Sequence, residues 1–402
     1  MIGSLYSGIS GLKANTSAMG VIGDNIANVE TTGFKSSSVS FANIFSSTMS
    51  QNSLQIGRGV TLNSVTPDWA NGSLENTNSP TDLSINGTGL FMVDDPSTNN
   101  TYYTRAGNFD WDKNGNLVTP DGFIAQGYSI ATDGTVGAVG DIAKPSGTSA
   151  PQATSNISFG MNLNGSAADG DTFDSSITTY DSLGSAVILD TQFVYDAANS
   201  RWNWSVSPSD GASASTGSLT FDANGVLSAP TTNPTIAVTG LTDGADPMSI
   251  TWNMVDSTGA SDGSVTGYTA DSAKTAQSQD GYPSGSLQSV SVSEDGTFTG
   301  VYSNGSMIPF ARVALADFPC YSGLAKQGSN LYSQSLASGQ PLVGPPNSAG
   351  MGSIAPSTLE KSNVDLGTEF VNMITTQRAF QANSKVITTS DSILSDLVNI
   401  IR

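Results

Sequence analysis

The sequence predicts a mainly β protein with α-helical termini, in which one β domain is inserted into another. Heptad patterns of apolar residues occur at both ends of the 402-residue chain. Between them, short apolar runs alternate with turn pairs such as Asn71-Gly72, Asn86-Gly87 and Asn114-Gly115, which is typical of hairpin-rich β structure. Two stretches rich in Pro, Ser and Gly, residues 143–155 and 277–285, are predicted linkers around the inserted domain.

The C-terminal helix is predicted from Leu366 onward. Its seam positions step by four and three residues, the spacing of a helix that packs lengthwise against other helices. Ser362 and Asp365 have the spacing of a capping box, and no proline interrupts the segment. The predicted apolar seam residues are Leu366, Phe370, Met373, Phe380, Ile387, Leu394, Val398 and Ile401.

A weaker heptad pattern runs through the first 28 residues. Glycines interrupt it, each costing on the order of 1 kcal/mol relative to alanine, so this helix must be stabilised by packing. Because both helices leave the same body, we expect them to pair as an antiparallel coiled coil. Periodicity leaves open whether the pair is an ordinary intramolecular hairpin or orders only when subunits stack. The predicted N-terminal seam residues are Leu5, Ile9, Leu12, Met19 and Ile26.

The predicted domains are nested. Residues 1–30 and 363–402 form a helical coiled-coil domain, residues 31–144 and 285–362 form an inner β domain, and residues 145–284 form an inserted acidic outer β domain. Asn28 caps the end of the first helix, and Gly33 takes the positive φ of a helix exit.

Composition excludes several functional classes. The net charge is −20, and only 12% of residues are charged. From Pro145 to Ala311 the chain carries sixteen acidic residues against Arg201 and Lys274. A chain this acidic, without a basic patch, argues against binding nucleic acid or anionic membranes. No apolar run approaches the roughly 20 residues of a membrane span, so no membrane insertion is expected. The N-terminus also lacks the pattern of a secretory signal peptide.

Few features of the sequence indicate a catalytic function. The chain has no histidine, which excludes Ser-His-Asp and Cys-His catalysis and the common zinc sites. Cys320 is the only cysteine, so no intramolecular disulfide forms, and we expect it to be a buried small apolar residue. Paired carboxylates could serve a carbohydrate-acting enzyme, but no particular pair stands out. We predict neither a catalytic residue nor a cofactor.

One acidic stretch has the spacing of a calcium loop. Asp110, Asp112, Asn114 and Asp121 match the ligand positions of an EF-hand loop, including an acid at position twelve. The flanking residues, however, have strand patterns rather than helical ones. The alternative is a hairpin turn whose Asp and Asn side chains satisfy local backbone groups. If calcium does bind, a secreted calcium-dependent β adhesin becomes the competing functional class.

Seven segments of the chain carry a resemblance to known proteins. They are residues 7–12, 25–35, 104–118, 302–305, 311–318, 362–370 and 373–385. Together they resemble the bacterial flagellar axial family of hook, rod and hook-associated proteins. The resemblance covers roughly residues 1–128 and 287–402, and residues 180–185 resemble the middle domain of the family's hook members. The resemblance implies that the large insertion favours a hook subunit, since rod members are typically shorter; a rod or hook-associated protein with an unusual insertion is the near alternative.

The resemblance implies a structural role. A subunit of this kind is exported unfolded by the flagellar type III apparatus, without a cleaved signal, to the outside of the cell. There it polymerises into a hollow, curved tube that transmits motor torque from rod to filament. Its implied partners are further copies of itself, the distal rod protein, the hook cap and the hook–filament junction proteins. The residues that match the family motif are Asn25, Asn28, Thr32, Gly33, Phe34 and Lys35.

Overall fold

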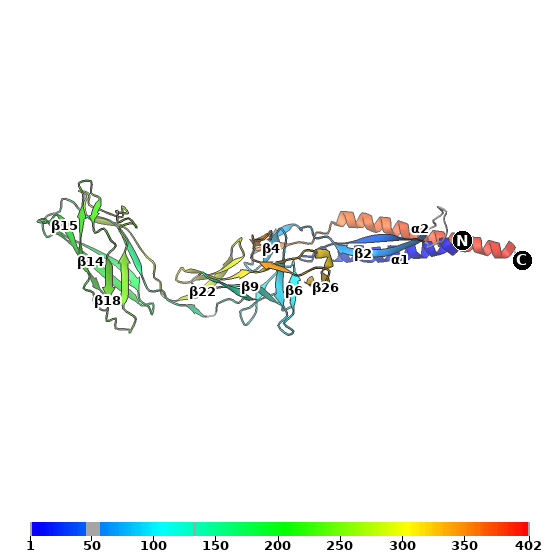
Figure 1. The fold of residues 1–402 in the computed structure, drawn as a ribbon, viewed down its shortest axis with the longest axis horizontal. Helices are drawn as coiled ribbons and strands as arrows, with labels where there is room; N and C mark the ends of the chain where they lie inside the picture. Colours follow the sequence, from blue (N-terminus) through cyan, green and yellow to red (C-terminus); the bar gives the residue numbers. More distant parts are fainter. Residues whose placement is uncertain (1, 46–56, 132–133, 146, 401–402) are drawn as a thin grey trace. The chain divides into compact units, whose positions relative to one another are not determined.

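The computed structural model describes residues 2–45, 57–131, 134–145 and 147–400. The chain forms two compact units. The terminal unit comprises Met1–Pro145, Val290–Gly300 and Ile308–Arg402, and the inserted unit comprises Ser146–Ser289 and Val301–Met307. The described residues are mainly strand, with one long helix near each end of the chain (Figure 1).

The two helices pack side by side and antiparallel, as predicted (Figure 1). They are α1 (Ile2–Ala27) and α2 (Leu366–Ile400). Ser4 Oγ lies 3.2 Å from Ser390 Oγ near one end of the pair, and Asn25 Nδ2 donates to Glu369 Oε1 at 3.1 Å near the other.

Asp365 caps α2 by itself. Its carboxyl accepts the N–H of Gly367 at 2.9 Å and the hydroxyl of Thr368 at 2.8 Å. Ser362 instead accepts the N–H of Val364 at 3.3 Å, before the helix begins. The predicted Ser362–Asp365 capping box is therefore wrong, because the helix starts three residues later than that box requires.

Glycines let α1 approach α2 closely. A Cβ added at Gly8 would lie 3.0 Å from Ile387 Cγ1, and one at Gly11 would lie 2.7 Å from Asn383 Nδ2. At Gly20 no heavy atom of the described residues lies within 4 Å of such a Cβ. A side chain at Gly8 or Gly11 would therefore press against α2, whereas one at Gly20 would not.

Most of the remaining strands form a hairpin and a β body, and of these β22 begins within the inserted unit, at residues 285–289. The hairpin pairs β1 (Ser37–Phe45) with β2 (Gly57–Pro67) in antiparallel register. In the body, a sheet runs in the order β22-β23-β24-β9-β5-β6-β27-β26, while β4 pairs with β29 and β3 with β30. The body strands are β3 (Leu74–Asn76), β4 (Leu83–Asn86), β5 (Leu90–Asp94), β6 (Thr101–Thr104), β7 (Asp110–Trp111), β8 (Leu117–Val118), β9 (Ile124–Ile130), β10 (Val136–Asp141), β22 (Gly285–Val292), β23 (Thr297–Tyr302), β24 (Met307–Val313), β25 (Leu315–Asp317), β26 (Ala325–Gly328), β27 (Leu331–Ser333), β28 (Leu342–Gly344), β29 (Ser353–Pro356) and β30 (Thr358–Glu360).

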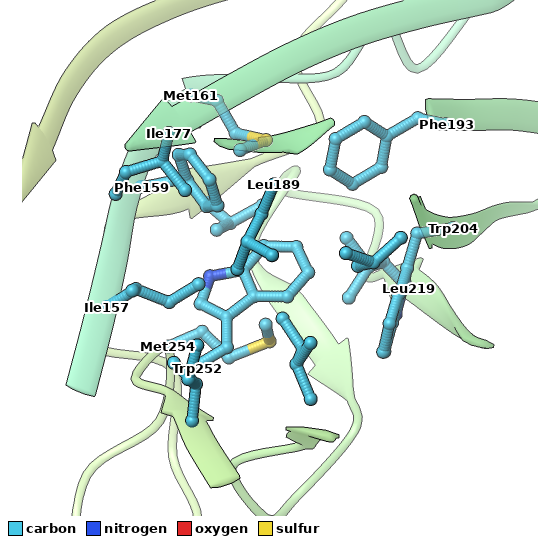
Figure 2. Close-up of a cluster of buried hydrophobic side chains, with 14 of the residues drawn as sticks. Ile157, Phe159, Met161, Ile177, Leu189, Phe193, Trp204, Leu219, Trp252 and Met254 are labelled. Atoms are coloured by element: carbon cyan, nitrogen blue, oxygen red, sulfur yellow. The ribbon is translucent and has the colours of Figure 1, made fainter. Parts of the chain in front are cut away.

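The inserted unit consists mainly of two five-stranded sheets around one aromatic core. Figure 2 shows Trp252 at the centre of that core, with Phe159, Phe193 and Trp204 around it at ring-centroid distances of 5.4, 6.0 and 5.5 Å. Buried and exposed residues alternate along β14 (Ala186–Asp196), which turns Val187, Leu189 and Phe193 into the core. Its strands are β11 (Thr148–Ser149), β12 (Asn156–Asn162), β13 (Thr172–Tyr180), β14 (Ala186–Asp196), β15 (Arg201–Pro208), β16 (Thr216–Phe221), β17 (Leu227–Ala229), β18 (Thr235–Val238), β19 (Met248–Trp252), β20 (Val265–Thr266) and β21 (Ala273–Gln279).

Two further predictions need correction. The expected linkers are partly strand, because β11 lies within the first stretch and β21 runs into the second. Cys320 is exposed rather than buried, with its Sγ 3.2 Å from Ser322 Oγ. It lies just before the short 3-10 helix Tyr321–Gly323, in a connection between strands where little packs over a side chain.

Candidate assembly surface

A buried ionic cluster joins the two helix ends to the β body. It consists of Lys35, Arg105 and Glu360, whose side chains are 1%, 4% and 0% exposed. Glu360 Oε1 accepts from Lys35 Nζ at 2.7 Å and from the N–H of Gly72 at 2.8 Å, while Oε2 accepts from Arg105 Nε. The cluster therefore links the segment after α1, the β body and the segment before α2.

The two cations are also held by backbone carbonyls. Lys35 Nζ donates to the carbonyl of Ala70 at 2.6 Å. Arg105 donates to the carbonyls of Ile85, Gly87 and Gly89 at 2.6, 2.7 and 2.6 Å. The guanidinium thus fixes the β4–β5 turn as well as Glu360, which uses the fixed fork geometry of arginine.

Burial and attraction act against each other on the ionisable groups of this cluster. Burial lowers the pKa of Lys35, and its hydrogen bond to Glu360 offsets this only in part. Burial raises the pKa of Glu360, but the opposing attraction of Arg105 and Lys35 is larger, so that pKa lies below its usual range. Glu360 is therefore an ionised carboxylate held between two cations at neutral pH.

The residues of the family motif lie at this junction. Gly33 has φ +67°, its N–H donates to the carbonyl of Glu360 at 2.8 Å, and an added Cβ would lie 2.6 Å from the backbone nitrogen of Ala106. Phe34 is buried. Only glycine fits at position 33. A Cβ there would collide with backbone atoms, and a residue with a side chain would be strained at this positive φ.

Asn25 connects both helices and the hairpin. It is 1% exposed, and its Nδ2 donates to the carbonyl of Ser37 at 2.9 Å as well as to Glu369, while its Oδ1 accepts the N–H of Ser37 at 2.9 Å. Asn28 Nδ2 donates to the carbonyl of Asp24 at 2.9 Å, and Thr32 offers its carbonyl to Asn330 Nδ2 at 2.9 Å.

The intrachain helix pair leaves much of the predicted seam uncovered. On α1, Leu5, Leu12, Met19 and Ile26 are half-buried and Ile9 is exposed. On α2, Met373, Ile387 and Leu394 are half-buried, whereas Leu366, Phe370 and Phe380 are exposed. Val398 and Ile401 lie outside the residues whose side chains the structure describes. Periodicity did not identify the face that α1 does bury. Its buried residues recur at spacings of three and four and are Gly8, Gly11, Ala14, Ala18, Ile22 and Asn25.

Large apolar side chains are exposed on the helices and the β1–β2 hairpin. Phe370, Val371 and Ile374 on α2 are 52%, 60% and 50% exposed. Large apolar side chains are normally buried, so their exposure in this number points to an interaction site. We call this set the terminal apolar surface, and its residues are Tyr6, Ile9, Phe41, Ile44, Leu62, Val65, Leu366, Phe370, Val371, Ile374, Phe380, Val386 and Ile393.

The predicted calcium loop is a hairpin turn between β7 and β8. Asp112 accepts the N–H groups of Asn114 and Asn116 at 2.8 and 2.7 Å, and Asp110 accepts the N–H of Trp111 at 2.7 Å. Asp121 lies in the next turn, after β8. Among the described residues no three His, Cys, Asp or Glu side chains are grouped to hold a metal ion.

No helix in the described part of the chain is long and apolar enough to span a bilayer.

Four family models match this chain, and all four describe flagellar proteins. Models described as "Flagella basal body rod protein" and "Flagellar basal body rod FlgEFG protein C-terminal" match residues 5–35 and 355–400. Those described as "Flagellar hook protein FlgE/F/G D1 domain" and "Flagellar basal body protein FlaE D2 domain" match residues 84–162 and 154–282. Together with the paired terminal helices and nested β regions, these matches define a bacterial flagellar axial protein.

Relatives that match over the full length of the chain identify its family more narrowly than the domain matches do. The chain is 33% identical over 444 residues to the flagellar hook protein FlgE of Borreliella burgdorferi, covering 100% of both chains. It is 34% identical over 415 residues to FlgE of Escherichia coli, covering 98% of each. A Helicobacter pylori flagellar hook protein FlgE2 structure has the same fold, with a TM-score of 0.54 and 14% identity, covering 71% of this chain and 100% of that one. The chain belongs to the flagellar hook protein family, a family of structural proteins.

Proposed function

We propose that the chain is a subunit of the bacterial flagellar hook and polymerises through the terminal apolar surface into a hollow, curved tube. The observation that carries the proposal is this surface, which the subunit's own fold leaves exposed. Fully burying a Val, Leu, Ile or Phe side chain contributes about 1.5–3 kcal/mol. Covering several of them with neighbouring copies offsets the cost of association, which is about 4–15 kcal/mol.

The predicted seam residues take part in these contacts between copies. Leu366, Phe370 and Phe380 are exposed in the single chain, and Ile9 is exposed on the partner helix. The half-buried seam residues contribute both to the intrachain pair and to its neighbours. Because the pair alone covers them poorly, the helices gain most of their stability on assembly.

The hook transmits motor torque from rod to filament, and the cluster of Lys35, Arg105 and Glu360 suits that task. Force applied to the terminal helices passes through the cluster to the β body, since the cluster lies just after α1 and just before α2. Buried ion pairs resist separation because breaking one leaves an unpaired charge inside the protein.

The further partners follow from the role in the flagellum. They are the distal rod protein, the hook cap and the hook–filament junction proteins, which meet the ends of the tube. The subunit reaches the outside of the cell through the flagellar type III export apparatus, without a cleaved signal. The acidic inserted unit, with two basic residues, keeps its surface soluble there.

The assembly surface is tested by a matched pair of valine substitutions. Val371 on α2 is 60% exposed, and Val136 on β10 is 54% exposed. Val371→Asp places a charge in the proposed contact, whereas Val136→Asp places the same charge on the β body. We expect seeded Val371→Asp protein to stay monomeric in sedimentation, while Val136→Asp forms tubes like the unchanged protein. Polymerisation of Val371→Asp at the unchanged rate would contradict the proposal.

A further inference from the structure

A cavity of about 370 Å³ lies in the terminal unit, against the buried ionic cluster. Lys35 and Arg105 are buried parts of its wall, whereas Ala70 and Thr88, which also line it, are exposed. The cavity therefore leads from the protein surface to two buried cations.

The ionic cluster holds one more positive charge than its own anion balances. Lys35 and Arg105 share the single carboxylate of Glu360. Asp68 also attracts Lys35, but Asp68 is exposed, so water and salt screen its charge. A buried charge without a partner is costly, and the wall of the cavity therefore favours one further negative charge.

Residues of the cavity wall also have unused N–H groups. Lys35 Nζ has three hydrogens and two acceptors among the described residues. Arg105 Nη1 has two hydrogens and one described acceptor, the carbonyl of Gly89 at 2.6 Å. Trp69 Nε1 is buried, and no residue that the structure describes accepts its hydrogen. Three side chains around one cavity thus each offer a hydrogen-bond donor.

The unpaired indole of Trp69 differs from the others in the chain by its surroundings. The indole N–H groups of Trp202, Trp204 and Trp252 also lack a described acceptor, but they lie in the aromatic core of the inserted unit among apolar side chains. Trp69 packs on Tyr321 with a ring-centroid distance of 5.0 Å, and both line the cavity that the two cations line. Of these four indoles, Trp69 is the one placed beside cationic side chains and an opening to solvent.

We propose that this cavity binds a carboxylate group. Its two oxygens accept hydrogen bonds from Lys35, Arg105 and Trp69, and its single charge balances the cation that Glu360 leaves over. A phosphate group carries a charge of about −1.5 to −2 at neutral pH and would exceed that balance.

The carboxylate has two sources, a small organic acid in solution or an acidic side chain of a neighbouring copy. The chain supplies many such side chains, with 34 Asp and Glu against 14 Lys and Arg. The residues that line the cavity are not part of the terminal apolar surface, so binding to the monomer does not depend on the proposed function.

Titration of the full-length monomer with sodium acetate tests the site, with NaCl at the same pH and ionic strength as the reference. The indole N–H signals are read by NMR of ¹⁵N-labelled protein, and the signal absent from Trp69→Phe identifies Trp69. We expect acetate to shift this signal to a saturating value and to leave the signals of Trp202, Trp204 and Trp252 in place. An unchanged Trp69 signal, or a larger shift in sodium phosphate than in acetate, would overturn the proposal.

Hydrogen exchange gives a second readout with a matched control. For a dissociation constant of about 10 mM, 100 mM acetate slows exchange that requires unfolding of the terminal unit about 11-fold relative to NaCl. Trp69→Phe keeps the ring but removes the N–H, so it should weaken this effect. Trp111→Phe, a change in the same unit at a residue outside the cavity wall, should keep it. A full effect in Trp69→Phe would contradict the assigned site.

Seeded tubes distinguish the two sources. If the carboxylate belongs to a neighbouring copy, the indole ¹⁵N signal of Trp69, read by solid-state NMR, reaches its acetate-bound position in tubes without acetate. If the ligand is a free acid, the signal moves there only when acetate is added. The monomer titration decides whether the site exists, even if the chain forms no tubes.

Discussion

Replacing Glu360 with Gln is expected to destabilise the terminal unit by roughly 3–5 kcal/mol, the cost of breaking a buried ion pair from one side. Both carboxylate oxygens of Glu360 accept hydrogen bonds, one from Lys35 and Gly72 and the other from Arg105. Glutamine has one acceptor oxygen, so its NH₂ group must face a donor, and two cations stay buried without an anion. Domains are stable by about 5–15 kcal/mol, so this loss is a large fraction of the total.

The matched control is Glu75→Gln, which removes the partner of Lys361 in an exposed pair at 3.1 Å. That change is expected to cost at most about 1 kcal/mol, because exposed ion pairs contribute little. Because the two units have separate hydrophobic cores, hydrogen exchange read by mass spectrometry assigns a loss of stability to one of them better than a single melting curve does. We expect Glu360→Gln to speed exchange in β4 and β5 while leaving β14 and β19 unchanged. Equal exchange in the two variants would refute the reasoning about the buried cluster.

Three further predictions follow from the same contacts. The folded-state pKa of Glu360 lies below its unfolded value, so its stabilising contribution is present above about pH 4.5 and is lost as pH falls through the folded pKa. Acid titration of unfolding should therefore show the gap between Glu360→Gln and the unchanged protein closing as the pH falls below that unfolded value. Gly33→Ala should lower stability by at least about 1–2 kcal/mol, because the residue has a positive φ and its Cβ would meet backbone, whereas Gly20→Ala should raise it by about 0.5–1 kcal/mol in urea unfolding. Phe380→Asp or Ile387→Asp should leave the melting transition of the β regions in place but block seeded polymerisation, since a charge buried in a packed helix contact is costly; loss of that transition would count against the prediction.

Periodicity was sufficient to predict the fold class. Heptad spacing at the two ends predicted α1 and α2, and turn pairs such as Asn114-Gly115 between short apolar runs predicted hairpin-rich β structure. These features are local in sequence, so they can be recognised without knowing what packs against them.

Contacts between distant residues could not be predicted in this way. The face that α1 buries is set by how closely Gly8 and Gly11 let α2 approach, which depends on Ile387 and Asn383. Likewise, the cluster of Lys35, Arg105 and Glu360 joins residues up to 325 positions apart, and no spacing rule connects them. A lone glutamate in a strand gives no signal that it is fully buried, because most glutamates are exposed.

Hydrogen exchange of α2 before and after seeding tests the central claim most directly. In the monomer, the segment from Leu366 to Ile393 has several exposed apolar residues and is expected to exchange quickly. In seeded tubes, which electron microscopy identifies, the same segment should become protected while β14 and β19 stay as they were. If α2 is already fully protected in a monomer that never forms tubes, the helices are an ordinary intramolecular hairpin and the terminal apolar surface is not an assembly surface.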